Sequence, residues 1–140
     1  MLANLFLFFL FIHSYLRWAV VLLMLYALFR AVWSWAQDRP WTKGDRQAGL
    51  FYTISLDLQL TLGLLLYALS GFATSMRFVG EHIITMTLAV VFAHLGSSLP
   101  KKVEDDRRKH RRAAIWFALS VLVIIFSIPW SQPLLRGLGM

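Results

Sequence analysis

The chain has 140 residues, of which 59% are hydrophobic and 15% are charged, and its formal net charge is +7. A soluble domain usually carries about a quarter charged residues, and a small domain cannot bury such an excess of apolar side chains. A soluble enzyme, a disordered chain and a nucleic-acid-binding domain are therefore disfavoured. The chain has no cysteine, which excludes disulfides, iron–sulfur clusters and thiol catalysis within it.

Four apolar segments follow one another along the chain, and each approaches or exceeds the roughly 20 residues that a membrane-spanning helix needs. The loops between them are short, which favours antiparallel neighbours. We expect residues 1–140 to form a single all-α transmembrane domain, an antiparallel four-helix bundle with up-down-up-down order. The predicted helices cover residues 3–36, 46–75, 81–99 and 112–130, each approximately.

Basic residues are distributed unevenly between the predicted loops. Eleven lie in or beside the first and third loops, and two lie in the second loop and the C-terminal tail. The positive-inside rule then places both termini outside and loops one and three in the cytoplasm. The third loop, residues 101–112, reads KKVEDDRRKHRR. We interpret it, including His110, as a solvated cytoplasmic retention signal that also attracts anionic lipid.

Short local signals add detail to the second and third helices. The run Thr42-Lys43-Gly44-Asp45 has the spacing of a capping box and predicts the start of the second helix. Ala89, Ala93 and Gly96 are small enough to let another helix approach the third one closely.

Five ionisable residues interrupt the apolar segments, and such residues are functional candidates by default. At 1.5 Å per residue, His13 and His82 lie about 10 Å and about 13 Å from the midplane, toward the outside. Asp57 and His94 both lie about 5 Å from the midplane, toward the cytoplasm. They therefore form an outer pair, His13 and His82, and an inner pair, Asp57 and His94. Arg17 follows His13 by one helical turn.

The outer pair, His13 and His82, predicts a haem site. Two imidazoles at one level on different helices can ligate haem iron axially, and Arg17 could pair with a propionate. Without cysteine the haem would be b-type, and without another inner imidazole we expect one haem. Two alternatives stay open. The histidines could instead bond water or headgroups while Arg17 reaches outward, or Met86 could replace one imidazole as an axial ligand.

The inner pair allows several interpretations. Asp57 could accept a hydrogen bond from His94 and fix its tautomer, so we expect contact directly or through one water. Thr53 and Thr61 lie four residues before and after Asp57, on the same helix face. This secondary polar site could line a water path, hold the headgroup of a quinone as a second ligand, or join two helices structurally.

Three runs carry a family resemblance: HSYLRW at 13–18, DLQLTLGLLLY at 57–67 and EHIITMTLAVVFAHLG at 81–96. With the TKGDR turn and the SIPW end of the fourth helix, they resemble a group of small four-helix bacterial membrane proteins labelled cytochrome b-like. The similarity covers nearly the whole chain. It implies four transmembrane helices and b-haem binding through His13 and His82.

These features predict a haem b protein of the bacterial inner membrane that passes electrons within a respiratory or quinol-linked chain. It would be an electron-transfer subunit with no catalytic domain of its own. Its expected partners are lipid, quinol, respiratory-complex subunits or further copies of itself, and no nucleic acid. The alternative is a non-redox accessory or assembly subunit, or a small transporter, in which the embedded His, Asp and Arg residues are structural.

Overall fold

A computed structural model describes residues 1–71 and 79–128, and every regular element in these two ranges is helical. Helix α1 covers Leu2–Ala36 and helix α2 covers Lys43–Leu69. A π-helical turn, η1 (Val79–Ile84), leads directly into α4 (Thr85–Ser98). A short 3₁₀ turn, η2 (Leu99–Lys102), then precedes α5 (Asp106–Ser127).

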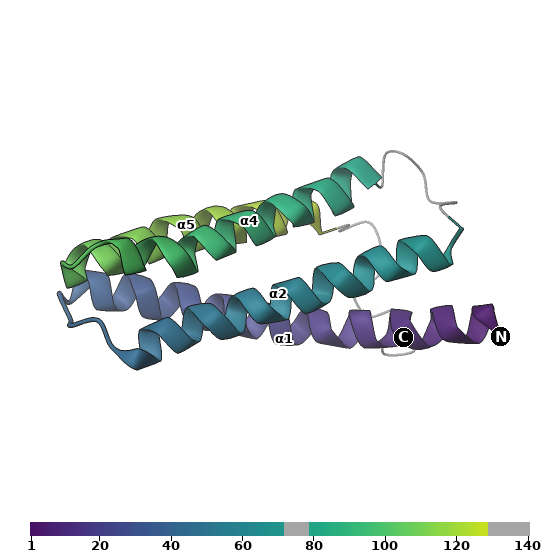
Figure 1. Ribbon diagram of the computed structural model, residues 1–140, viewed down its shortest axis with the longest axis horizontal. Helices are drawn as coiled ribbons and strands as arrows, with labels where there is room; N and C mark the ends of the chain where they lie inside the picture. Colours follow the sequence, from purple (N-terminus) through teal and green to yellow (C-terminus); the bar gives the residue numbers. More distant parts are fainter. Residues whose placement is uncertain (72–78, 129–140) are drawn as a thin grey trace.

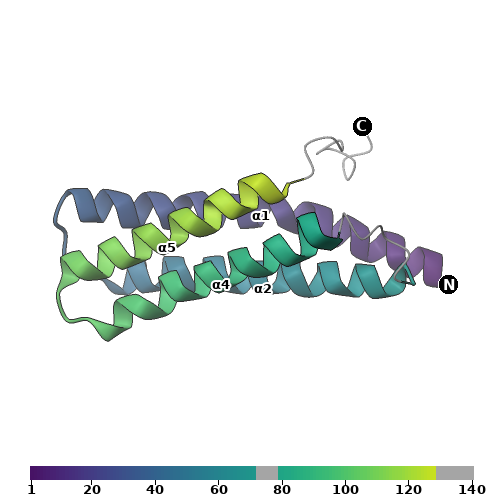
Figure 2. The same cartoon turned by 90° about the horizontal axis from the view of Figure 1, so that it is seen from above.

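The four long helices lie side by side as a bundle (Figure 1). The connections from α1 to α2 and from α4 to α5 lie at one end, and the N-terminus lies at the other, as Figure 2 also shows. A hydrogen bond joins the α1–α2 connection to the start of α5, because His110 Nε2 donates to the carbonyl oxygen of Arg39 at 3.0 Å. The predicted all-α four-helix bundle is confirmed.

The dimensions and surface of the bundle suit a lipid bilayer. Four helical segments are long and apolar enough to cross it: Leu2–Ala36, Lys43–Leu69, Gly80–Lys102 and Asp106–Ser127. At 1.5 Å per residue α1 extends about 52 Å, which exceeds the roughly 30 Å of a hydrocarbon core. Large apolar side chains are exposed along the bundle, among them Leu22, Leu58, Val91 and Phe126. The chain is therefore a multi-pass membrane protein.

Helix α2 begins at Lys43, three residues before the predicted boundary, because the predicted capping box forms there. The backbone N–H of Thr42 donates to Asp45 Oδ2 at 2.8 Å, and the other carboxylate oxygen accepts from Arg30 Nε at 2.7 Å. The helix ends at Leu69, before the predicted 75, and Gly71 follows with a φ of 68°. Residues 72–75 of the prediction lie outside the described residues.

The predicted boundaries of the third loop and the fourth helix were wrong. Helix α5 starts at Asp106, six residues before the predicted start at 112, because Asp105 caps it by accepting from the backbone N–H of Arg108 at 3.0 Å. Most of the basic run 101–112 is therefore helix. The last predicted residues of this helix, 129–130, lie outside the described residues.

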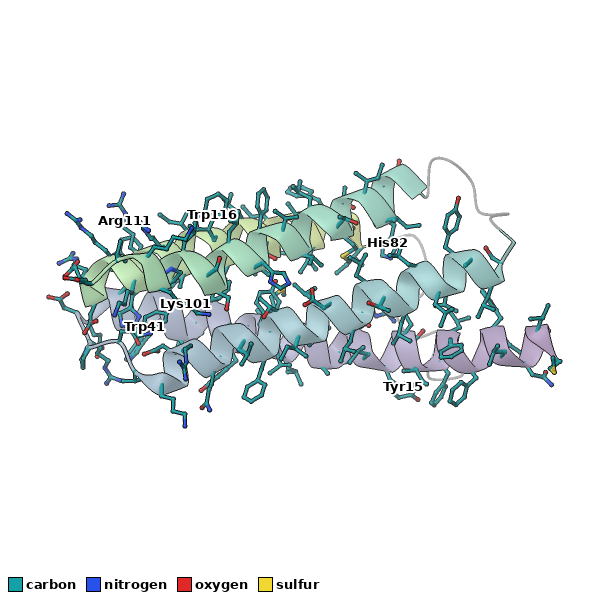
Figure 3. All side chains as sticks on the ribbon, viewed as in Figure 1. Tyr15, Trp41, His82, Lys101, Arg111 and Trp116 are labelled. Atoms are coloured by element: carbon teal, nitrogen blue, oxygen red, sulfur yellow. The ribbon has the colours of Figure 1, made fainter. Side chains whose placement is uncertain are left out.

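The interpretation of His110 as part of a solvated run was also wrong. His110 is fully buried, and its ring centroid lies 5.0 Å from that of Trp41. Because the basic run is helical, only one of its faces meets water, and His110 lies on the opposite face. There it joins the start of α5 to the α1–α2 connection. Figure 3 shows Trp41, Lys101 and Arg111 together at this end of the bundle.

The core is built largely from small side chains, as predicted for the third helix. Ala89, Ala93 and Gly96 are all buried. A Cβ atom at Gly96 would lie 2.6 Å from two ring atoms of Phe117, so this glycine makes room for an aromatic ring of α5. Small residues of this kind allow membrane helices to approach closely.

A short polar chain crosses the apolar core. The hydroxyl of Tyr52 donates to Ser120 Oγ at 2.8 Å, and Ser120 Oγ in turn donates to the carbonyl oxygen of Ala89 at 2.7 Å. These two bonds connect α2, α5 and α4. Neutral hydroxyl groups in apolar segments gave no sequence signal for this contact.

Candidate functional site

A cavity of about 490 Å³ lies between α1, α2, η1, α4 and α5, and it contains the outer pair. His13 and Arg17 reach it from α1, Gln59 and Gly63 from α2, and His82 from η1. Most of the remaining wall is apolar and includes Leu56, Leu60, Met86, Val90 and Ile124. The volume falls within the range of about 300–1,000 Å³ that is typical of ligand pockets.

His82 is held by the end of α5. Its Nδ1–H donates to the carbonyl oxygen of Ser127 at 3.2 Å, and the hydroxyls of Ser127 and Thr85 lie 2.6 Å apart. The bond from His82 to the Ser127 carbonyl places the proton of the imidazole on Nδ1, so Nε2 carries the lone pair of the neutral ring. A histidine ligand is commonly oriented in this way through its other nitrogen. Figure 3 shows the His82 side chain directed toward the other helices.

The backbone that carries His82 is a π-helical turn, Val79–Ile84. Such turns are rare and occur frequently at functional sites, because the extra residue changes the direction of the side chains that follow. The sequence predicts a plain α-helix from residue 81, because the apolar pattern of this segment does not distinguish an α-helix from a π-helical turn.

His13 is held by Gln59, a residue that the sequence analysis missed. The Gln59 amide nitrogen donates to the carbonyl oxygen of His13 at 3.0 Å and lies 3.3 Å from ring Nε2. Within the described residues, His13 Nδ1 and Gln59 Oε1 are buried and have no hydrogen-bond partner. Buried polar atoms in this state usually cost about 1–3 kcal/mol each. Each of these two atoms, His13 Nδ1 and Gln59 Oε1, could therefore still form a bond to a ligand in the cavity.

Gly63 provides space for the ring of His13. A Cβ atom at this position would lie 3.2 Å from His13 Cε1, which is closer than ordinary van der Waals contact. The absent side chain thus lets the imidazole lie against the backbone of α2. Arg17 also lines the cavity, and its guanidinium carbon lies 5.9 Å from the Trp18 ring centroid. His13, His82 and Arg17 all line this one cavity.

The inner pair makes direct contact, so the predicted interaction between Asp57 and His94 is confirmed. His94 Nε2 lies 2.9 Å and 3.0 Å from the two carboxylate oxygens of Asp57. The side chain of Asp57 is 45% exposed and that of His94 is 52% exposed, so the pair lies on the outer surface of the bundle. The hydroxyl of Thr61 donates to the backbone carbonyl of Asp57 at 2.7 Å.

Thr53 does not belong to this exposed polar group, contrary to the prediction. It is buried, and its hydroxyl donates to the carbonyl oxygen of Leu50 at 2.8 Å. The reason is geometric: a separation of four residues rotates a side chain by about 40° around a helix, which is enough to leave a narrow surface stripe.

The two pairs lie on different sides of α2. Leu56 and Gln59 line the cavity, whereas Asp57 faces outward to His94. Within the described residues, no group of three or more His, Asp or Glu side chains could hold a metal ion. Comparisons of the chain with family models, with curated proteins and with solved structures gave no match.

Proposed function

We propose that this protein binds one haem b and carries single electrons within a quinol-linked or respiratory chain of the bacterial inner membrane. One observation carries the proposal: His13 and His82, from α1 and η1, line one cavity together with Arg17. Two imidazoles that reach a shared apolar space from different helices are the donor set of a low-spin haem. The resemblance to the cytochrome b-like group points to the same two histidines.

The local bonding of each histidine is compatible with this role. His82 donates from Nδ1 to Ser127, which makes Nε2 the nitrogen available to iron. His13 would exchange the 3.3 Å contact between its Nε2 and Gln59 for a bond to iron. Gln59 would still hold the backbone carbonyl of His13. Ser127 would thus keep the ring of His82 oriented, and the ring of His13 would remain packed against Gly63.

A bound haem would supply a one-electron carrier. The protein's own residues would set its behaviour. His13 and His82 would hold the haem iron through their imidazole nitrogens, a ligand set suited to electron transfer. Arg17 would lie beside an anionic propionate, which offsets the cost of a cation in the membrane. Apolar side chains such as Leu60 and Val90 would exclude water from the macrocycle.

The proposed orientation follows from the charges. Basic residues gather at the end of the bundle that carries the connections 37–42 and 103–105. The positive-inside rule places this end in the cytoplasm and both termini outside. The haem cavity would then lie nearer the outer side of the membrane, accessible to an acceptor there.

The test is an optical spectrum of four purified variants. We expect His13→Ala and His82→Ala each to remove or convert the low-spin haem signal. His94→Ala is the matched control, because this imidazole lies outside the cavity, and it should keep the wild-type spectrum. Arg17→Ala should keep both ligands but retain haem less well. If His13→Ala and His82→Ala both keep the wild-type spectrum, the assignment is wrong.

A specific observation favours one alternative, an accessory subunit without a redox group. Gln59 bonds to His13 and Ser127 bonds to His82, so each histidine already ties two helices together. In that case His13→Ala and His82→Ala would lower bundle stability, and protein expressed with ample haem would contain none. Stability and haem content measured on the same samples separate the two functions.

A further inference from the structure

We propose that the Asp57–His94 pair binds the headgroup of a membrane quinone at the lipid-facing surface of α2 and α4. Both residues belong to helices that span the membrane, yet their side chains are about half exposed. Ionisable groups in membrane spans almost always face the bundle interior or a water-filled cavity. This pair instead faces outward, away from the haem cavity, so a ligand can reach it from the bilayer.

The surroundings of the pair restrict the chemistry of that ligand. Apolar side chains are exposed on both sides of it, with Ile54 and Leu58 on α2 and Leu88 and Val91 on α4. A ligand that arrives here must have an apolar body and a group that forms hydrogen bonds within the membrane. Phospholipid headgroups stay at the interface and hydrated ions avoid the hydrocarbon. A quinone has both required parts.

The hydrogen bonding of His94 suits both redox states of a quinone. Nε2 faces the carboxylate of Asp57, which orients the ring. Among the described residues nothing hydrogen-bonds to Nδ1. When Nε2–H donates to the carboxylate, neutral His94 has its lone pair on Nδ1, which can accept from a quinol hydroxyl. When the ring is protonated, Nδ1–H can donate to a quinone carbonyl.

The position of the pair also relates it to the proposed haem. Asp57 follows the cavity residue Leu56 directly, so its side chain lies about 100° further around α2 and contacts His94 on the outer surface. The pair and the cavity therefore lie on adjacent sides of α2. The role of the quinone as electron partner rests on the proposed function, whereas binding of the headgroup does not require haem.

The test uses the full chain in lipid nanodiscs and a photoactivatable azidoquinone. After illumination, peptide mass mapping should find the label on α2 near Asp57 and on α4 near His94, and excess unlabelled quinone should displace it. Label elsewhere, or label that unlabelled quinone does not displace, would overturn the proposal. So would cross-links between copies across this face, because a second copy would then cover the pair.

Variants measure the contribution of the two side chains. We expect Asp57→Asn and His94→Leu to weaken quinone binding by roughly tenfold or more, since each removes part of a charge-assisted hydrogen bond. Thr87→Val is the control, because Thr87 is exposed two turns from His94 on the same face of α4. Unchanged affinity in both pair variants contradicts the proposal. The wild-type labelling pattern decides the matter if a variant fails to fold.

One further variant separates this inference from the proposed function. His13→Ala should lose the haem signal and keep quinone binding, because His13 lies in the cavity and not beside the pair. Loss of quinone labelling with a normal haem spectrum would overturn the quinone site alone. Absence of haem with normal labelling at Asp57 and His94 would overturn the haem assignment alone.

Discussion

The substitution Gly96→Ala tests how tightly the core of the bundle is packed. A new Cβ atom would lie 2.6 Å from ring atoms Cδ1 and Cε1 of Phe117 and 3.2 Å from Cβ of Trp116. Carbon atoms pack best at about 3.5–4.0 Å, so the ring would have to move by about 1 Å. It has little room, because a Cβ at Gly49 on the opposite side would already lie 3.0 Å from Phe117 Cζ.

The expected loss of stability follows from two opposing contributions. Overpacking of a well-packed core typically costs about 1–3 kcal/mol. Replacing a glycine by alanine within a helix raises the free energy of unfolding by up to about 1 kcal/mol, because alanine has the higher helix propensity. Gly80→Ala is the matched control, because no atom lies within 4 Å of the new methyl group. The free energy of unfolding should therefore be about 1–3 kcal/mol lower for Gly96→Ala than for Gly80→Ala.

Equilibrium unfolding in mixed micelles, followed by circular dichroism, measures this difference. Addition of Phe117→Leu to Gly96→Ala should recover part of the lost stability, because the smaller side chain relieves the clash. Equal stability of Gly96→Ala and Gly80→Ala would refute the packing of α4 against α5 described above.

Three other predictions concern the core, the connection between α1 and α2, and the orientation in the membrane. Ser120→Ala should lower the free energy of unfolding by about 1 kcal/mol, because the buried Tyr52 hydroxyl loses its acceptor; a double-mutant cycle with Tyr52→Phe in which the effects simply add would contradict the contact. His110→Ala should make the connection 37–42 more sensitive to protease, because the bond to Arg39 is lost, and unchanged cleavage rates would count against that anchor. Reporter fusions should place both termini outside, and a cytoplasmic C-terminus would reverse the proposed orientation.

The main architecture could be predicted because the lipid environment constrains the chain strongly. Long apolar segments had to be helices, since a spanning helix satisfies its own backbone hydrogen bonds. The capping box at Thr42 could be recognised because its two residues, Thr42 and Asp45, lie close together in the sequence. The start of α5 was missed because the basic residues 107–112 resembled a loop, whereas Asp105 caps a helix there. The burial of His110 depends on its contact with Arg39, 71 residues away in the chain, and has no local signal.

The candidate sites could be predicted only where charge marked them. Asp57 and His94 interrupt apolar segments at similar depth, and counting residues was enough to pair them. Gln59, Ser127 and the π-helical turn around His82 were missed. A neutral amide, a hydroxyl or a backbone carbonyl is common in membrane helices, so its importance appears only when the partner helix is in place. The outward direction of the inner pair likewise depends on how α2 and α4 pack.

The reduced-minus-oxidised optical spectrum of the wild-type protein, purified after expression with ample haem, tests the central claim most directly. We expect sharp α and β bands of a single low-spin haem b after reduction with dithionite, with one haem per chain. A preparation that is folded and contains no haem, or one whose haem is high-spin, would contradict ligation by His13 and His82.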